Sequence, residues 1–287
     1  MGKIVIVGSG PAGCSAALYA ARAGQEVVVI SMGMGALSKA ELIQNYYGFE
    51  EGITGAELYR QGVAGAKAVG AEFITAEVVG LDYTGSLVVQ TTEGDYPADA
   101  VILATGAGRI APKIAGLAEH EGRGVSYCAT CDAFFYRGKT AAVLGSGEYA
   151  LHEVQALLPL AGKVILCTNG EPLTADFPEG VTVCTEKLAA VEGEEKVSAL
   201  RPENGELLPV EGLFVALGVA GSAALARKLG APVENGRIVV DEKMQTGIPG
   251  LFAAGDCTGG MLQVCKAVYE GALAATEAIK MLRGKKR

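Results

Sequence analysis

The fold of this chain is decided near its start, by Lys3-Ile4-Val5-Ile6-Val7-Gly8-Ser9-Gly10-Pro11-Ala12-Gly13. A continuous apolar run of this length predicts a strand of a parallel sheet that is buried on both faces. The G-x-G-x-x-G pattern after it is typical of a turn that opens a helix and cradles a pyrophosphate. An alanine-rich helix that Gly24 ends, and a second strand from Gln25 to Ile30, complete a β-α-β unit.

The glycines of this turn have separate physical roles. Gly8 permits the tight turn, Gly10 lets the backbone approach a pyrophosphate, and Gly13 lets the helix pack on the strand. The alternative is a glycine-rich turn without a ligand, and the strand–turn–helix context weakens it. The acid expected after the second strand is replaced by Ser31, so contact with a ribose must be weaker or come from elsewhere.

The middle of the chain repeats this opening unit. Thr140 to Leu144 is a second apolar strand, and Gly145-Ser146-Gly147-Glu148-Tyr149-Ala150 is a second glycine turn. A helix from about 148 to 160 and a strand from Lys163 to Cys167 follow it. The repeat predicts an α/β fold with two doubly wound, three-layer dinucleotide-binding-type domains. Two such units imply either two cofactors or one cofactor and one vestigial site.

Two closely spaced cysteines lie just before the second unit, in Tyr127-Cys128-Ala129-Thr130-Cys131-Asp132. The C-x-x-C spacing lets two sulfurs form or open a disulfide with little movement of the chain, and Asp132 can exchange a proton with a departing thiolate. Half a zinc site and two unrelated buried cysteines are the alternatives. Zinc normally takes four cysteine or histidine ligands, whereas there is no second C-x-x-C and the only histidines are His120 and His152. We therefore predict a redox pair and no metal site.

The composition argues against several classes of function. A net charge of −8 argues against a general nucleic-acid binder. No apolar run is long enough to span a bilayer, and a strand that begins at Lys3 leaves no room for a signal peptide. The seven cysteines are an odd, scattered set, unlike a secreted disulfide framework. We therefore expect a cytoplasmic protein in which a disulfide is catalytic.

Taken together, these motifs resemble the low-molecular-weight thioredoxin reductase family, and the likeness covers essentially the whole chain. The resemblance implies an FAD-binding domain, at about 1–111 and 218–287, split by an inserted pyridine-nucleotide-like domain at about 112–217 that carries the redox cysteines. It also implies a homodimer that reduces the disulfide of a thioredoxin-like protein. The reducing group would be the Cys128–Cys131 dithiol, with Asp132 as the acid.

The resemblance further assigns residues to an FAD site. The first glycine turn would hold the pyrophosphate through Gly8, Ser9, Gly10, Pro11 and Ala12. The remaining residues match a flavin-contacting Asn, an Ala-Thr-Gly strand end, a Gly-Asp pair whose acid contacts FAD, and a Gln near the flavin ring. In chain order these are Asn45, Thr105, Gly106, Gly255, Asp256 and Gln263.

The sequence departs from the family in the second unit. NADPH-using members follow the second strand there with a His-Arg-Arg cluster that binds the 2′-phosphate, but this chain has Thr168-Asn169-Gly170. No Lys or Arg occurs between Lys163 and Lys187. Losing two charge-assisted hydrogen bonds costs about a hundredfold or more in affinity for the phosphate. We therefore expect reduced ferredoxin as the electron donor, as in the ferredoxin-dependent flavin thioredoxin reductases.

Several alternatives stay open. The chain can instead be an NAD(P)H-dependent thioredoxin reductase, because the second glycine turn is intact. It can also be an oxygen-using oxidase that forms a disulfide in a small molecule, or a non-catalytic flavin-binding sensor, although the intact C-x-x-C-D argues against a sensor. Cys257 and Cys265 flank the segment after Gly255-Asp256 and are an alternative second redox pair.

Overall fold

The computed structural model describes residues 2–107, 113–218 and 220–284. The chain separates into two compact units. Unit 1 comprises Met1–Arg109 and Gly221–Arg287, and unit 2 comprises Ile110–Ala220. The predicted boundary between residues 217 and 218 falls a few residues before the end of unit 2. The predicted boundary between residues 111 and 112 lies outside the described residues.

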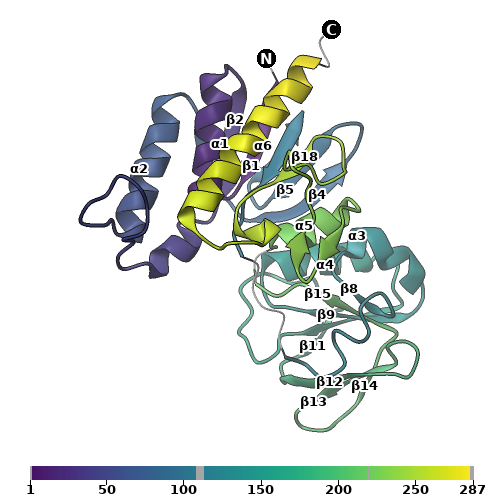
Figure 1. Ribbon diagram of the computed structural model, residues 1–287. Coiled ribbons are helices and arrows are strands. Elements are labelled where there is room, and N and C mark those ends of the chain that lie inside the picture. The colour runs from purple at the N-terminus through teal and green to yellow at the C-terminus, as the bar shows by residue number, and fades with distance from the viewer. Residues whose placement is uncertain (1, 108–112, 219, 285–287) are drawn as a thin grey trace. The chain divides into compact units, whose positions relative to one another are not determined.

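Unit 1 is built on a parallel five-stranded sheet in the order β18-β7-β1-β2-β3. Figure 1 labels β1, β2 and β18 of this sheet. Its strands are β1 (Lys3–Val7), β2 (Glu26–Ser31), β3 (Glu72–Thr75), β7 (Ala100–Leu103) and β18 (Leu251–Ala253). The first strand, β1, pairs with β2 on one side and with β7 on the other. The first glycine turn therefore leaves from the middle of the sheet, where strand carboxyl ends meet and ligands bind in such folds.

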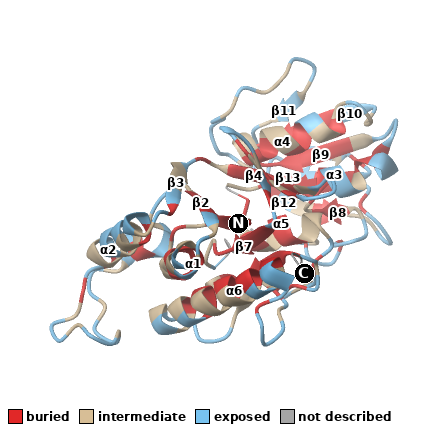
Figure 2. Cartoon of the chain, turned by 90° about the horizontal axis from the view of Figure 1, so that it is seen from above, coloured by how far each residue is buried: buried red, intermediate tan, exposed pale blue. Residues whose placement is uncertain are grey.

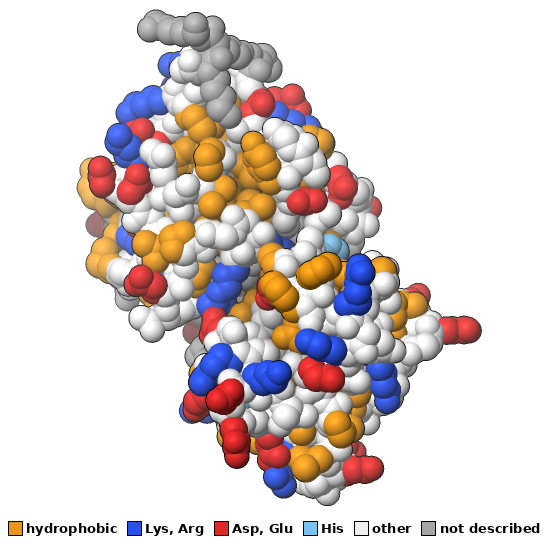
Figure 3. Space-filling model, turned by 90° about the vertical axis from the view of Figure 1, so that its right-hand side faces the viewer, with side chains coloured by type: hydrophobic (Ala, Val, Ile, Leu, Met, Phe, Trp, Pro, Cys, Tyr) orange, Lys and Arg blue, Asp and Glu red, His pale blue; other side chains and the backbone are white. Residues whose placement is uncertain are grey.

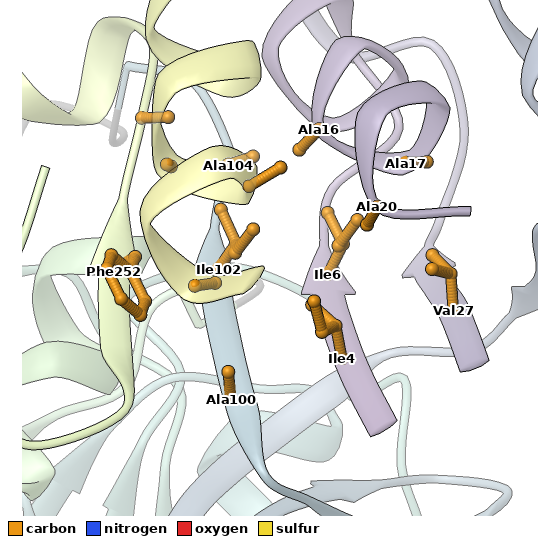
Figure 4. Close-up of a cluster of buried hydrophobic side chains, with 14 of the residues drawn as sticks. Ile4, Ile6, Ala16, Ala17, Ala20, Val27, Ala100, Ile102, Ala104 and Phe252 are labelled. Atoms are coloured by element: carbon orange, nitrogen blue, oxygen red, sulfur yellow. The ribbon is translucent and has the colours of Figure 1, made fainter. Parts of the chain in front are cut away.

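The main helices of unit 1 are α1 (Pro11–Arg22), α2 (Gly55–Ala68), α5 (Ser222–Lys228) and α6 (Val264–Gly284). Helices α1 and α6 face each other and the sheet through small residues such as Ala16 and Ala274, which are fully buried. Figure 4 shows Ala20 of α1 beside Ile6 of β1. A Cβ atom on Gly271 would lie 2.0 Å from the Ala12 carbonyl oxygen, so the two helices meet backbone to backbone.

Smaller elements complete unit 1. An antiparallel sheet is formed by β4 (Val78–Tyr83), β5 (Leu87–Thr91) and β6 (Gly94–Ala98). A hairpin joins β16 (Val233–Glu234) to β17 (Arg237–Ile238), and two 3-10 helices, η1 (Gly35–Lys39) and η3 (Asp256–Thr258), lie between larger elements. Strands β3 and β4 follow each other closely in the sequence but belong to different sheets, because β3 pairs in the parallel sheet and β4 in the antiparallel one.

Unit 2 repeats the parallel arrangement in the order β11-β10-β9-β15-β8. The strands are β8 (Val125–Ser126), β9 (Thr140–Leu144), β10 (Lys163–Cys167), β11 (Thr182–Cys184) and β15 (Gly212–Val215). A second, antiparallel sheet contains β12 (Leu188–Glu192), β13 (Ala199–Pro202) and β14 (Leu208–Pro209). Apolar residues of both sheets, among them Leu144 and Leu200, form one buried cluster. Figure 2 shows most of β9 coloured as buried.

The helices of unit 2 are α3 (Ala129–Asp132) and α4 (Glu148–Leu157), with the 3-10 helix η2 (Ala133–Tyr136) after α3. Helix α4 ends earlier than the predicted residue 160. Pro159 has no backbone N–H, so the series of i→i−4 hydrogen bonds cannot continue past Leu158, which explains the early end. Two parallel sheets with packed helices confirm the predicted α/β class and its two dinucleotide-binding-type units.

No helix within residues 2–107, 113–218 and 220–284 is long and apolar enough to cross a membrane. On the face of the molecule shown in Figure 3, acidic and basic side chains are interspersed, and hydrophobic side chains form small groups. The net charge of −8 is therefore not gathered into a single-sign patch on this face.

Candidate active site

A pocket of about 330 Å³ lies at the carboxyl edge of the unit 1 sheet. Its lining includes every residue that the sequence predicts for the cofactor. In chain order these are Gly8, Ser9, Gly10, Pro11, Ala12, Asn45, Thr105, Gly106, Gly255, Asp256 and Gln263. Segments that are far apart in the sequence thus meet around one cavity.

The glycines of the first turn divide into two kinds. A Cβ atom on Gly8 would lie 2.3 Å from the Ala104 carbonyl oxygen, and one on Gly13 would lie 1.8 Å from the Gly8 carbonyl oxygen. A Cβ atom on Gly10 would meet nothing within 4 Å. The fold itself therefore requires Gly8 and Gly13, whereas Gly10 leaves open space. This space lies at the N-terminus of α1, where no side chain caps the helix, and it fits the pyrophosphate of FAD.

Hydrogen bonds also hold other residues of the pocket lining. The Asn45 side-chain amide donates to Gln263 Oε1 at 2.8 Å, so the two residues predicted to lie near the flavin contact each other. Thr105 Oγ1 accepts a hydrogen bond of 2.9 Å from the Ser222 backbone N–H and lies 2.7 Å from Ser222 Oγ. The sequence did not predict Ser222, because α5 is short and lies far along the chain from β7.

Hydroxyl groups gather where the sequence lacks an acid after β2. Ser31 Oγ is hydrogen-bonded to Ser9 Oγ at 2.7 Å, and Ser9 Oγ lies 3.1 Å from the Tyr59 hydroxyl. Hydroxyls can donate and accept hydrogen bonds without the full charge of a carboxylate. Tyr59 comes from α2, and no local sequence pattern connects it with the glycine turn.

In unit 2, Cys128 and Cys131 are joined by a disulfide, with their Cα atoms 5.4 Å apart. Cys128 is the N-cap residue of α3, and its sulfur accepts a hydrogen bond of 3.1 Å from the Cys131 backbone N–H. Cys128 is buried, whereas Cys131 is exposed. The two residues of the disulfide thus differ in exposure, and Cys128 is the one held at the start of a helical turn.

Asp132 is held beside this disulfide by one hydroxyl group. Ser126 Oγ donates to Asp132 Oδ2 at 2.6 Å and accepts a hydrogen bond of 3.1 Å from the Cys128 backbone N–H. A carboxylate fixed in this way suits proton exchange with the redox pair. From α4, the buried Glu153 Oε2 accepts a hydrogen bond of 2.5 Å from the Ala129 backbone N–H. Neither Ser126 nor Glu153 was predicted from the sequence, because their roles depend on how the chain folds back.

The remaining buried thiols are poorly reactive. Burial raises the pKa of Cys14 to about 12, that of Cys167 to about 12 and that of Cys257 to about 11. These thiols therefore stay protonated at neutral pH, and the thiolate is the reactive form. Cys257 is buried and Cys265 is exposed, and both are free thiols here rather than partners in a second disulfide.

The second glycine turn differs from the first in what covers it. The Thr174 backbone N–H donates to the Ser146 carbonyl oxygen at 2.8 Å, and a Cβ atom on Gly147 would lie 3.0 Å from Thr174 Oγ1. The segment after β10 thus folds back over the turn. Helix α4 begins with a carboxylate, Glu148. Glu148 also lines a cavity of about 640 Å³ together with Thr174, Asp176 and Glu179, so three carboxylates surround this space.

The segment Thr168-Asn169-Gly170 follows β10 with no Lys or Arg of its own. Asn169 has a φ of 56°, and its side-chain oxygen accepts a hydrogen bond of 2.9 Å from the Leu188 backbone N–H. The structure adds a cation that the sequence did not predict here. A Cβ atom on Gly170 would lie 3.2 Å from Lys187 Cε, so the Lys187 side chain runs beside this segment.

The chain is similar to known proteins in both sequence and structure. The family model of the pyridine nucleotide-disulphide oxidoreductases matches residues 2–271. A thioredoxin reductase of Aquifex aeolicus (strain VF5) is 35% identical over 99% of this chain and 94% of the relative. The structure of the atypical thioredoxin reductase TRi from Desulfovibrio vulgaris Hildenborough is 40% identical, with a TM-score of 0.93 and 99% of each chain covered. A ferredoxin-flavin thioredoxin reductase from Clostridium acetobutylicum is 34% identical, with a TM-score of 0.75, covering 99% of this chain and 98% of that one.

These matches extend over almost the whole chain, so they cover the positions of both glycine turns and of Cys128 and Cys131. They confirm the resemblance seen in the sequence, and with it the prediction of FAD as the cofactor. The chain therefore belongs to the pyridine nucleotide-disulphide oxidoreductase family and, within it, to the low-molecular-weight thioredoxin reductases.

Proposed function

We propose that this protein is an FAD-dependent enzyme that reduces the disulfide of a thioredoxin-like protein, with electrons from reduced ferredoxin rather than from NADPH. The Cys128–Cys131 disulfide and the relatives named thioredoxin reductase support the reaction. The observation that carries the choice of donor is the covered second glycine turn, because a nucleotide donor would need this turn to be open.

The electrostatics of the second turn also disfavour NADPH. Its pyrophosphate would have to lie over Ser146 and Gly147, where the Thr174 backbone already bonds to Ser146. The carboxylates of Glu148, Asp176 and Glu179 line the adjoining cavity and would repel a polyanionic nucleotide. By contrast, Gly10 of the first turn faces open space. The two turns thus have similar sequences but offer a phosphate group very different surroundings.

Reduced ferredoxin is a donor that does not need the second glycine turn. A small iron–sulfur protein delivers single electrons and needs access to the flavin, not a nucleotide pocket. The relative from Clostridium acetobutylicum, named a ferredoxin-flavin thioredoxin reductase, supports this choice.

The chemistry at the disulfide follows from thiol exchange. Bound FAD supplies a carrier that can collect single electrons and release them in pairs. Two electrons and two protons convert the Cys128–Cys131 disulfide to a dithiol. The thiolate of one cysteine then attacks the partner disulfide to form a mixed disulfide, and the other cysteine displaces the reduced partner and restores the original disulfide. Asp132, held by Ser126, supplies the proton that the departing thiolate takes up.

An exposed aromatic pair follows the redox helix and supports binding of a protein partner. Phe134 and Phe135 are 67% and 66% exposed, and their rings contact each other edge to face. Arg137 lies over the Phe134 ring, with its guanidinium carbon 5.4 Å from the ring centroid. Exposed aromatic and Arg side chains are typical anchors of protein interfaces. We therefore propose that this pair contacts the thioredoxin-like partner.

Changing Phe134 and Phe135 together to serine is expected to raise the KM for thioredoxin by about tenfold, because interface aromatics contribute strongly to binding. Reduction of the flavin by the electron donor should stay within about twofold of the wild-type rate, since this step does not involve the partner. Leu207→Ser is the matched control, because Leu207 is also exposed in unit 2 but lies next to β14 rather than α3. An unchanged KM in the double variant would place the partner elsewhere.

Lys187 favours a second candidate function, an NADPH-dependent thioredoxin reductase. Its side chain runs beside Gly170, the segment where NADPH-using relatives place their arginines. One lysine provides a point charge for a 2′-phosphate but not the two-pronged contact of an arginine. This candidate also requires the segment around Thr174 to move off the second glycine turn.

The donor experiment separates these candidates. Wild-type protein is mixed anaerobically with reduced ferredoxin, NADPH or NADH, and the loss of the oxidised-flavin absorption is followed. We expect ferredoxin to reduce the flavin at least about a hundredfold faster than either nucleotide, given the charge-assisted bonds that the nucleotide site lacks. Rapid bleaching by micromolar NADPH that Lys187→Met abolishes would overturn the ferredoxin proposal in favour of the second candidate.

The same preparation tests the oxidase alternative. Rapid reoxidation of the reduced flavin by oxygen, without reduction of any thioredoxin, would support the small-molecule oxidase. We also propose a homodimer, which the family resemblance supports, and a cytoplasmic location, which the scattered cysteines support. Sedimentation analysis of the FAD-loaded protein tests the homodimer.

A further inference from the structure

Asp256 is presented to the FAD pocket by a tight turn at the end of β18. The turn begins at Gly255, whose φ of 85° favours glycine, and continues through η3 to Gly259. A Cβ atom on Gly255 would lie 2.9 Å from Ala12 Cβ, so the turn packs against the first turn of α1. The position of the Asp256 carboxylate therefore depends on the shape of this short backbone segment.

Two charged residues of α6 hold the backbone on both sides of Asp256. Glu270 Oε2 accepts hydrogen bonds from the Gly255 backbone N–H at 2.8 Å and from Thr258 Oγ1 at 2.9 Å. Lys266 Nζ donates to the carbonyl oxygens of Gly255 at 2.8 Å and Gly259 at 2.6 Å, and to Thr258 Oγ1 at 2.9 Å. The two side chains form an ion pair of 2.9 Å and are only 14% and 11% exposed.

Stability alone does not explain why a buried ion pair stands at these two positions of α6. Well-packed apolar residues at the same positions of a helix are often as stable as a buried ion pair, because burying charge costs solvation. Here, both charged groups bond to the turn between Gly255 and Gly259. Gly255 and Asp256 line the pocket, whereas Lys266 and Glu270 do not, so the pair lies behind the pocket wall.

We propose that Lys266 and Glu270 are positioning residues for FAD, which act by holding the turn that presents the Asp256 carboxylate to the cofactor. Neither residue belongs to the glycine-turn or Gly-Asp motifs, and the pair acts through Asp256 rather than by touching FAD. The proposal rests on the FAD site assigned above and does not depend on which donor reduces the flavin.

The test is a comparison of FAD dissociation constants, measured by titrating each apoprotein with FAD and following the quenching of flavin fluorescence. The variant Lys266→Met with Glu270→Gln removes both charges, so neither is left buried without its partner. We expect its dissociation constant to rise by about tenfold to a hundredfold, as for the loss of charge-assisted hydrogen bonds. In a protein that already carries Asp256→Asn, the same pair of changes should raise the dissociation constant by less than about a further twofold. The effects of coupled residues are not additive, and the ion pair is proposed to act through Asp256.

A matched control lies on the same helix. Lys280 and Glu277 form an ion pair of 2.6 Å in which the lysine is 65% exposed. Lys280→Met with Glu277→Gln should leave the dissociation constant within about twofold of wild type, because exposed pairs contribute little. If the Lys266 and Glu270 double variant does not fold by circular dichroism, Lys266→Gln with Glu270→Gln replaces it, since this variant also leaves no charge buried without its partner. The same rise in the dissociation constant is expected.

Two outcomes would overturn the proposal while leaving the FAD site intact. The first is an unchanged dissociation constant in the variant of the ion pair. The second is an equal loss of affinity whether or not the protein also carries Asp256→Asn, which would mean that the pair stabilises unit 1 in general. A wild-type apoprotein that does not bind FAD would instead refute the cofactor site itself.

Discussion

Serine in place of Cys128 or Cys131 is expected to lower the rate of thioredoxin reduction by at least about a thousandfold. Losses of this size are typical when a residue that forms a covalent intermediate is removed. A single remaining sulfur cannot form the intramolecular disulfide or complete the exchange with the partner. Reduction of the flavin by ferredoxin should continue in both variants, because that step precedes the disulfide. Stopped-flow absorption measures the flavin step, and a coupled insulin-reduction assay measures the thioredoxin step.

The control for this experiment is Cys265→Ser, which removes an exposed free thiol from α6 and should leave both rates unchanged. Thioredoxin turnover at the wild-type rate in Cys131→Ser would show that the C-x-x-C pair is not the reducing group. Loss of flavin reduction as well would point instead to damage to the fold, since Cys128 caps α3.

The second large effect is expected at Gly10. Gly10→Glu should lower the affinity for FAD by at least about a thousandfold, because it places a carboxylate where we expect the pyrophosphate to lie. The apoprotein should keep its fold, since a Cβ atom on Gly10 meets no atom within 4 Å. A colourless purified protein with an unchanged circular dichroism spectrum is the expected result.

Two other glycines give this test its controls. Gly65 lies in α2, and a Cβ atom there also meets nothing within 4 Å, so Gly65→Glu should still bind FAD. Gly13→Ala should damage the fold itself, because its Cβ atom would lie 1.8 Å from the Gly8 carbonyl oxygen. A yellow Gly10→Glu protein with full FAD content would refute the assignment of the first glycine turn.

The sequence predicted those parts of the fold in which the signal is local. The apolar run from Lys3 to Val7 and the glycines after it form one uninterrupted strand–turn–helix, and Thr140 to Ala150 repeats it. In both places a single pattern encodes the strand, the turn and the start of the helix, and the structure confirms the pattern. The composition of residues 72–79 does not show where β3 ends and β4 begins, because the two strands differ in their distant pairing partners.

The parts of the sites that the sequence did not predict depend on contacts between distant segments. Thr174 covers the second glycine turn, and Lys187 runs beside Gly170, but neither residue belongs to a motif. As a sequence motif the second turn is intact, because its glycines are present. The second turn differs from the first because the segment around Thr174 packs against it, whereas Gly10 of the first turn faces open space. The position of that segment depends on the tertiary fold.

The order of the strands in unit 1 has a consequence for biosynthesis. Strand β18 pairs with β7, and α6 packs on α1, so the ribosome must make nearly the whole chain before the unit 1 sheet is complete. Unit 2 is continuous in sequence and emerges entirely before β18. Domains generally fold as units during synthesis. The helix that follows Cys128 can therefore form before the FAD pocket is complete, so the Cys128–Cys131 pair is synthesised before the chain can bind the cofactor that would reduce it.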